Sequence, residues 1–175
     1  FKERLAMLLE AVRLTVPQFN LERAGLGPYS GEELRLIMLI ANTYTAGQRY
    51  EEAERVYRIG LEYLEANGRS LPQYFYLKPA YTANYANALA WTGRWQEALE
   101  LAEGGIAECL EYKRYHVLDT LLWVKAYCCY CLGRREESAR LYRQVYSLLL
   151  STREMRRLLI LKEQVTELMD IKFEE

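Results

Sequence analysis

The sequence predicts an all-α fold in which antiparallel helical hairpins stack into a right-handed superhelix. The main observation is a spacing: at three places a small residue is followed, twelve positions later, by a second small residue. The three pairs are Ala41 with Ala53, Ala86 with Ala98, and Ala126 with Ser138. A short break that contains a glycine lies between the members of each pair. Because two antiparallel helices approach closely only where small side chains face each other, the repeated spacing predicts a repeated hairpin.

The composition fits one domain with a core of its own. The chain has 175 residues, of which 51% are hydrophobic, so residues 1–175 are expected to form a single domain. A net charge of −1 gives this segment no electrostatic reason to bind nucleic acid directly. No apolar run approaches the roughly 18 to 20 residues that span a membrane, and the first ten residues carry both charge signs, unlike a secretory leader. We therefore expect a cytoplasmic location without membrane contact.

A leading helix and a loop are predicted before the first hairpin. An apolar stripe marks a capping helix over residues 1–16, and Pro17 ends it because proline has no backbone N–H to donate. Gly25 and its glycine and proline neighbours make residues 18–30 a loop. Ser30 or the glycine after it then caps the next helix.

Three hairpin units follow, with approximate bounds 32–68, 73–112 and 115–150. Their helices are expected over residues 32–46 and 50–67, 73–92 and 95–111, and 115–132 and 135–150. Pro79 predicts a kink or offset in the first helix of the second unit. Gly68 is expected to end the second helix of the first unit.

A terminal capping helix is predicted over residues 153–172. Its apolar residues fall on one face and are Leu158, Leu161, Val165, Leu168 and Met169. A stack of hairpins leaves an apolar edge open at its end, so this helix is expected to cover that edge. The same face offers a surface through which two chains could form a homodimer.

Two glycines inside helices predict close packing between successive units. Gly60 and Gly105 each follow the second small residue of their unit by seven positions, although glycine inside a helix costs about 1 kcal/mol relative to alanine. A cost accepted twice at the same offset indicates that the next helix approaches closely. The third unit has Val145 there, so its neighbour is expected to stand farther off or tilt.

The sequence offers no constellation of catalytic or metal-binding residues. Three of its four cysteines lie within Cys128–Cys131 and the fourth is Cys109, and no second cysteine pair or histidine pair completes a zinc site. They are expected to be reduced, buried side chains. His116 is the only histidine, and no phosphate-binding loop or nucleophile motif is present. We therefore expect a binding module and not an enzyme, with no cofactor and no metal.

The units resemble the tetratricopeptide repeat. The matching residues are Ile37, Ile40, Ala41 and Tyr44 with Ala53 and Tyr57 in the first unit, and Tyr85, Ala86 and Leu89 with Gly93 to Ala98 in the second. The third unit departs most, with Lys125 at a position that is usually apolar and Ser138 in place of alanine. The resemblance covers about residues 32–150 and implies a superhelix whose first helices line a concave groove.

The order of elements along the whole chain is similar to the C-terminal sensor part of bacterial helix-turn-helix transcriptional regulators of the XRE type. This resemblance implies a peptide-binding and dimerising sensor, whose DNA-binding domain lies outside this chain and ahead of Phe1. The alternative is a stand-alone tetratricopeptide scaffold that joins proteins. A helix-turn-helix domain encoded upstream of Phe1 would distinguish the first function from the second.

Eight residues are predicted to line the concave groove and bind a peptide or protein ligand. They are Asn42, Asn87, Asn84, Met38, Trp123, Tyr127, Tyr130 and Arg35. An amide side chain offers both a donor and an acceptor, the complement of a peptide bond, so Asn42 and Asn87 in successive units could clamp an extended backbone. Peptide-sensing members of the resembled family use asparagine in this way. The alternative is structural: these asparagines bond neighbouring helices or water, and Met38 and Trp123 fill the core.

Overall fold

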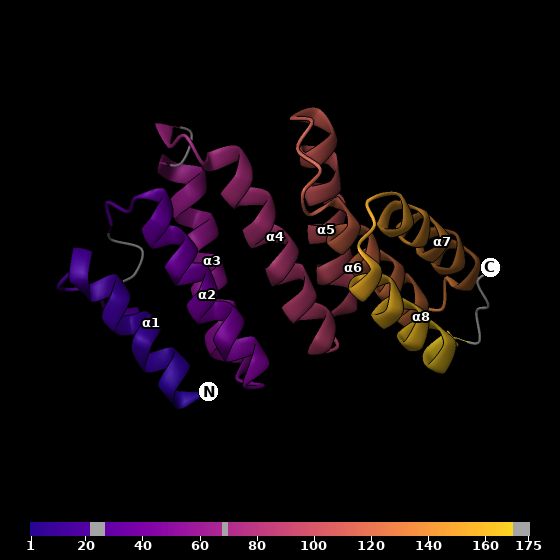
Figure 1. Cartoon of the computed structure of the whole chain (residues 1–175), viewed down its shortest axis with the longest axis horizontal. Helices are drawn as coiled ribbons and strands as arrows, with labels where there is room; N and C mark the ends of the chain where they lie inside the picture. Colours follow the sequence, from indigo (N-terminus) through magenta and orange to yellow (C-terminus); the bar gives the residue numbers. More distant parts are fainter. Residues whose placement is uncertain (22–26, 68–69, 170–175) are drawn as a thin grey trace.

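The computed structural model describes residues 1–21, 27–67 and 70–169, and within them it contains eight α-helices and no strand. The helices are α1 (Lys2–Thr15), α2 (Gly31–Ala46), α3 (Tyr50–Asn67), α4 (Tyr74–Trp91), α5 (Trp95–Glu111), α6 (Leu118–Cys131), α7 (Arg135–Ser151) and α8 (Met155–Met169). They follow one another along the long axis of the molecule, with α1 at one end and α7 and α8 at the other (Figure 1). The all-α superhelix of hairpins is therefore confirmed.

The small residues lie at the contacts inside the hairpins α2–α3, α4–α5 and α6–α7, as predicted. All six of the paired residues are fully buried: Ala41, Ala53, Ala86, Ala98, Ala126 and Ser138. In the third hairpin the hydroxyl of Ser138 donates a hydrogen bond of 2.8 Å to the carbonyl oxygen of Ala126, twelve residues earlier. Serine thus replaces alanine without leaving its buried hydroxyl unpaired.

The stack bends toward its first helices. α2 contacts α4, and α4 contacts α6, whereas α3, α5 and α7 do not contact one another in the described part of the chain. Helices that converge on one side and diverge on the other form a curved array, so α2, α4 and α6 make its inner, concave face.

Both predicted close approaches are confirmed. A Cβ atom on Gly60 would overlap the ring of Tyr81 in α4, and one on Gly105 would lie 2.9 Å from Leu121 in α6. The hydroxyl of Tyr81 continues across the unit boundary and donates a hydrogen bond of 2.6 Å to the carbonyl oxygen of Leu34. Each glycine therefore lets a large side chain of the next unit lie directly on its helix.

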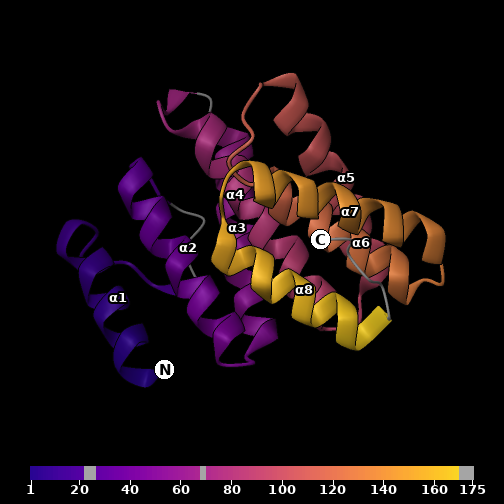
Figure 2. The same ribbon diagram turned by 45° about the vertical axis from the view of Figure 1, so that its right-hand side comes forward.

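The terminal helix stands off, as Val145 predicts. α8 contacts α7 but, unlike α4 or α6, makes no backbone-level contact with the first helix of the preceding unit. Leu158, Leu161 and Val165 are nevertheless buried in the core cluster around α5, α6 and α7, so α8 covers the open edge as expected. Turning the molecule brings α8 to the front, beside α7 and across α6 (Figure 2).

The predicted starts of two helices differ from the structure by more than one residue. α6 begins at Leu118 rather than Tyr115, because His116 binds the carbonyl oxygen of Tyr76 at 3.0 Å and holds the preceding residues outside the helix. Pro79 lies inside α4 and does not end it, and the kink expected there stays a prediction. α8 begins at Met155 rather than residue 153.

The first hairpin has the helix cap that the sequence predicts. The Ser30 hydroxyl accepts from the backbone N–H of Glu33, and the Glu33 carboxylate accepts from the backbone N–H of Ser30. The predictions that concern Gly25, Gly68, residues 170–172 and the side chains of Leu168 and Met169 lie outside what the structure describes.

Candidate functional site

The structure gives the two asparagines of the predicted clamp different environments. The Oδ1 atom of Asn42 accepts a hydrogen bond of 2.5 Å from the hydroxyl of Tyr57, which also lies 3.3 Å from the Thr45 hydroxyl. Tyr57 is buried, and burial raises the pKa of its phenol to about 12. The acceptor half of Asn42 is thus used inside the first hairpin.

Asn87 has no such partner. Among the described residues its side chain makes no hydrogen bond, although it lies one unit further along at the position equivalent to Asn42. The reason is visible in the sequence: the residue four positions after the second small residue is Tyr57 in the first unit but Ala102 in the second. Because alanine has no hydroxyl, the Asn87 amide keeps both its donor and its acceptor available.

Aromatic side chains from neighbouring helices surround Asn87. This region, here called the Asn87 site, is formed by Asn87, Ala90, Trp91, Trp123, Val124, Tyr127, Tyr142 and Gln164. The rings of Trp91 and Tyr127 lie 5.9 Å apart at 35°, and 49% of Trp91 is exposed. The enclosed space is only about 20 Å³, which holds one water, so a ligand here would lie over the surface.

Tyr142 is buried and lines the Asn87 site together with Trp123. Burial raises the pKa of the Tyr142 phenol, so it stays protonated at neutral pH. The structure thus brings together Asn87, Trp123 and Tyr127 of the predicted groove residues. It adds Trp91 and Gln164, which the sequence analysis did not select.

The other predicted groove residues are spread along the inner face. The Asn84 amide donates to the sulfur of Met38 at 3.5 Å, which joins α4 to α2. Arg35 lies at the far rim, with its guanidinium 5.3 Å from the centre of the Tyr76 ring. Tyr130 lies near the turn into α7, where the Arg135 guanidinium covers its ring at 3.9 Å.

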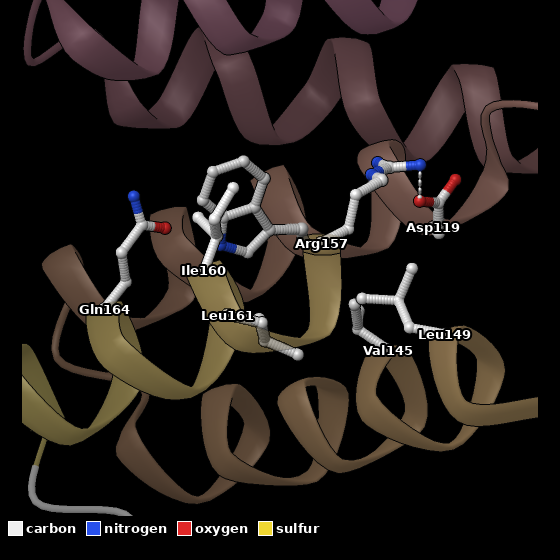
Figure 3. A pocket seen from close by; sticks show the side chains of 8 residues that line it. Asp119, Val145, Leu149, Arg157, Ile160, Leu161 and Gln164 are labelled. Carbon is white, nitrogen blue, oxygen red and sulfur yellow. Dashed lines mark ion pairs between the residues drawn. The ribbon is translucent and has the colours of Figure 1, made fainter. Parts of the chain in front are cut away.

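A second, larger cavity lies where α8 stands off from α6. This α8 cavity has a volume of about 120 Å³ and is lined by Asp119, Trp123, Val145, Leu149, Arg157, Ile160, Leu161 and Gln164. Arg157 reaches from α8 to form an ion pair with Asp119 and donates a hydrogen bond of 2.8 Å to the Thr120 hydroxyl (Figure 3). The sequence signal that predicted the gap between α8 and α6 was Val145, at the position equivalent to Gly60 and Gly105.

Two buried side-chain oxygens of residues that line the α8 cavity accept no hydrogen bond from the described residues, and one of them, Asp119 Oδ2, is in the ion pair with Arg157. The Oε1 atom of Gln164 is buried and accepts no hydrogen bond from the described residues. Gln164 lines both the α8 cavity and the Asn87 site, as does Trp123. The two spaces are therefore neighbours along a single strip.

Three of the four cysteines have the buried environment that the sequence predicts, whereas Cys131 is partly exposed. Cys109, Cys128 and Cys129 are buried and all four thiols are free. Burial raises the pKa of the Cys128 thiol to about 12, which suppresses the reactive thiolate at neutral pH. Within the described ranges, no three His, Cys, Asp or Glu side chains are grouped so as to hold a metal ion.

Comparison with known proteins rests on the fold alone. No family model and no curated protein matches the chain. Two solved structures of a Podosopora anserina protein, described as a kinesin light chain with nearly identical TPR-like repeats, do match, one of them a point variant. The variant is 20% identical with a TM-score of 0.60, covering 87% of this chain and 68% of that chain. The other is 18% identical with a TM-score of 0.62, covering 86% and 68%.

The chain has a tetratricopeptide-like fold. This likeness supports the repeat assignment made from the small-residue spacing. It carries no information on the ligand, because the sequence identity is low. None of the helices in the described part of this tetratricopeptide-like chain is long and apolar enough to cross a membrane.

Proposed function

We propose that this tetratricopeptide-like domain binds an extended segment of a peptide or partner protein along its inner face, with the Asn87 site as the main contact. The observation that carries the proposal is the unpaired Asn87 amide among Trp91, Trp123 and Tyr127. An amide with a free donor and a free acceptor matches a peptide bond. Trp91 is half-exposed and Trp123 and Tyr127 are partly exposed, and aromatic rings of this kind supply the contact area that dominates many protein interfaces.

The charges on the inner face favour a neutral ligand segment. Met38, Ala83 and Trp123 occupy equivalent places in the three units, and none of them is charged. Lys125 is paired with Glu103 at 2.8 Å, so it is not available to bind a carboxylate. A ligand held mainly by its acidic C-terminus would need cations at these places.

The two asparagines are assigned different roles. Asn42 holds the first hairpin together through Tyr57, whereas Asn87 contacts the ligand. This replaces the symmetrical clamp of two asparagines by a single amide with aromatic neighbours.

An array of short peptides, followed by calorimetry on those that bind, tests the proposal. Asn87→Ala should weaken binding about tenfold, the effect of losing roughly 1.4 kcal/mol, with an unchanged thermal midpoint. Asn42→Ala is the matched control and should lower the thermal midpoint while changing affinity little. Equal affinity of wild type and Asn87→Ala for every selected peptide would refute the assignment.

The domain is further proposed to be the sensor part of a bacterial transcriptional regulator, in which ligand binding biases an attached DNA-binding domain. The support is the similarity in the order of elements, from the leading helix through the three hairpins to α8. Reading the gene upstream of the Phe1 codon tests this. A helix-turn-helix domain there supports the sensor, and any other upstream sequence favours the stand-alone scaffold.

Dimerisation through α8 is part of the same proposal. The predicted apolar face is already used inside the chain, since Leu158, Leu161 and Val165 are buried. A second apolar face of α8 is open, where Met155 is 53% and Leu159 58% exposed. Light scattering at high concentration should give the mass of a dimer, and Leu159→Glu should restore the monomer; a monomeric wild type contradicts it.

A further inference from the structure

We propose that the α8 cavity receives one branched aliphatic side chain of the ligand, and that Gln164 Oε1 accepts a hydrogen bond from that residue's backbone N–H. The inference deepens the proposed function and rests on it. The juxtaposition that carries it is a largely apolar cavity of about 120 Å³ beside an unpaired buried acceptor, directly next to the Asn87 site.

The cavity follows from the repeat itself. Gly60 and Gly105 allow the next first helix to settle onto the preceding unit, where Tyr81 and Leu121 fill the space. The third unit has Val145 at the equivalent position, and there α8 makes no backbone-level contact with α6 and leaves the α8 cavity. Folded proteins are packed with few voids. A space of this size lies where valine replaces the glycine of the first two units, and we interpret it as a binding site for a group of the ligand.

The size and walls of the cavity fit an aliphatic group. A cavity of roughly 150 Å³ lined by apolar side chains stays dry and binds benzene, so about 120 Å³ suits a side chain of leucine or isoleucine size. Val145, Leu149, Ile160 and Leu161 provide apolar walls. Asp119 and Arg157 neutralise each other at one end, so the cavity offers nothing to a charged side chain.

The unpaired Gln164 Oε1 atom indicates which ligand group lies next to the aliphatic side chain. Buried polar atoms in folded proteins almost always have a partner, and Gln164 Oε1 has none in the described residues. Figure 3 shows the Gln164 carboxamide at one end of the cavity, with its oxygen turned toward Ile160. Since a peptide residue carries an N–H beside its side chain, it can fill the cavity and satisfy this oxygen together.

Continuity with the Asn87 site favours a peptide over a free small molecule. Trp123 and Gln164 belong to both spaces. A chain that lies over Asn87 therefore passes the mouth of the α8 cavity and can place one side chain in it. The ligand class is a neutral extended peptide with a leucine-like anchor residue.

The test uses N-acetyl-leucinamide as the probe and follows the indole N–H of Trp123 by NMR. Shifts that saturate with a millimolar dissociation constant, the range for a ligand of this size, are expected. N-acetyl-glycinamide and N-acetyl-lysinamide should give no saturable shift. Equal shifts with the glycine compound, or none with the leucine compound, would overturn the inference.

Two variants distinguish an effect on probe binding in the α8 cavity from an effect on the stability of the fold. Gln164→Met keeps the shape but removes the acceptor, so it should weaken probe binding about tenfold without lowering the thermal midpoint. Gln144→Met, an exposed site on α7, is the matched control and should change neither. Val145→Leu fills part of the cavity and should abolish probe binding. Unchanged binding in Gln164→Met or in Val145→Leu means that the probe does not occupy the α8 cavity and contradicts the proposal.

The outcome is separable from that of the proposed function. If array-selected peptides lose affinity in Asn87→Ala but the leucine probe does not bind, the groove function stands and the α8 cavity is empty of ligand. If no peptide depends on Asn87, the proposed function fails whatever the probe does.

Discussion

At the scale of single residues, two asparagines at equivalent positions of successive units differ in whether a neighbouring side chain bonds their amide group. Asn42 and Asn87 follow the small residues Ala41 and Ala86 in the same way. Only the presence of Tyr57, or of Ala102 in its place, makes one amide structural and the other available. The position of both on the inner helices was predictable from spacing. The pairing was not predicted, because it depends on comparing a second position fifteen residues away.

The single histidine offers a test of the local packing. The ring of His116 is stacked on Tyr76, with centroids 4.1 Å apart and planes at 9°. Removal from water and, to a lesser degree, the positive charge of Arg114 lower the pKa of His116 below its ordinary value of 6.5. We expect an NMR titration to give a pKa below 6.5, and Tyr76→Ala to raise it.

The sign of the pH effect on stability follows from that shift. The unfolded chain binds the proton of His116 more tightly than the folded chain does. The stabilisation is therefore complete above pH 6.5 and is lost as the pH falls through the lower, folded-state pKa. A His116 resonance that titrates above 6.5 in the wild type would show that the stack does not form.

At the scale of elements, a glycine decides how closely two units meet. Gly104 and Gly105 are adjacent in α5, but a Cβ on Gly104 meets nothing within 4 Å, whereas one on Gly105 lies 2.9 Å from both Leu121 and Thr82. Spacing alone identified the second glycine. The first is an exposed helical position with no packing role.

The two glycines should respond in opposite directions to the same substitution. Gly104→Ala should stabilise the protein by about 0.5–1 kcal/mol, because alanine is the better helix former. Gly105→Ala should destabilise it by about 1–3 kcal/mol, because α6 must shift. Urea unfolding of both variants measures this. Stabilisation by both would mean that α5 and α6 do not approach as described.

The attachment of α8 is a contact that no local pattern revealed. Arg157 stood in a cluster of mixed charges in the sequence, yet its guanidinium pairs with the buried Asp119, thirty-eight positions away by sequence number, and with Thr120. Long-range pairs of this kind arise from the superhelix and not from helix periodicity. The same holds for the start of α6, which the contact between His116 and Tyr76 sets.

Removing that ion pair should loosen α8. Arg157→Ala leaves Asp119 without its cation and should cost about 1 kcal/mol, a modest figure because the Arg157 side chain is 43% exposed. Hydrogen exchange should speed up in α8 and stay unchanged in α2 to α5. Arg156→Ala, its exposed neighbour, serves as the control and should leave α8 as protected as in the wild type. An equal effect of the two substitutions would exclude a specific role for the pair.

At the scale of the whole molecule, the repeated hairpins place α2, α4 and α6 on the inner face, and the regular spacing changes where α8 follows the last hairpin. The hairpins, their order and the inner position of α2, α4 and α6 were predictable from small residues and glycines, because those signals are local and periodic. The aromatic surroundings of Asn87 were only partly predictable, since Trp91 and Gln164 come from α4 and α8, helices that are far apart in the sequence. The departure from the repeat at α8 creates both the α8 cavity and the junction with the Asn87 site.

The most direct test of ligand binding on the inner face is an NMR footprint of an array-selected peptide on the whole chain. The account predicts that the side-chain amide of Asn87, the indole N–H groups of Trp91 and Trp123, and backbone amides of α4 and α6 shift on binding. Amides of α3, α5 and α7 should change little. A footprint centred on those second helices, with Asn87 unaffected, would contradict it.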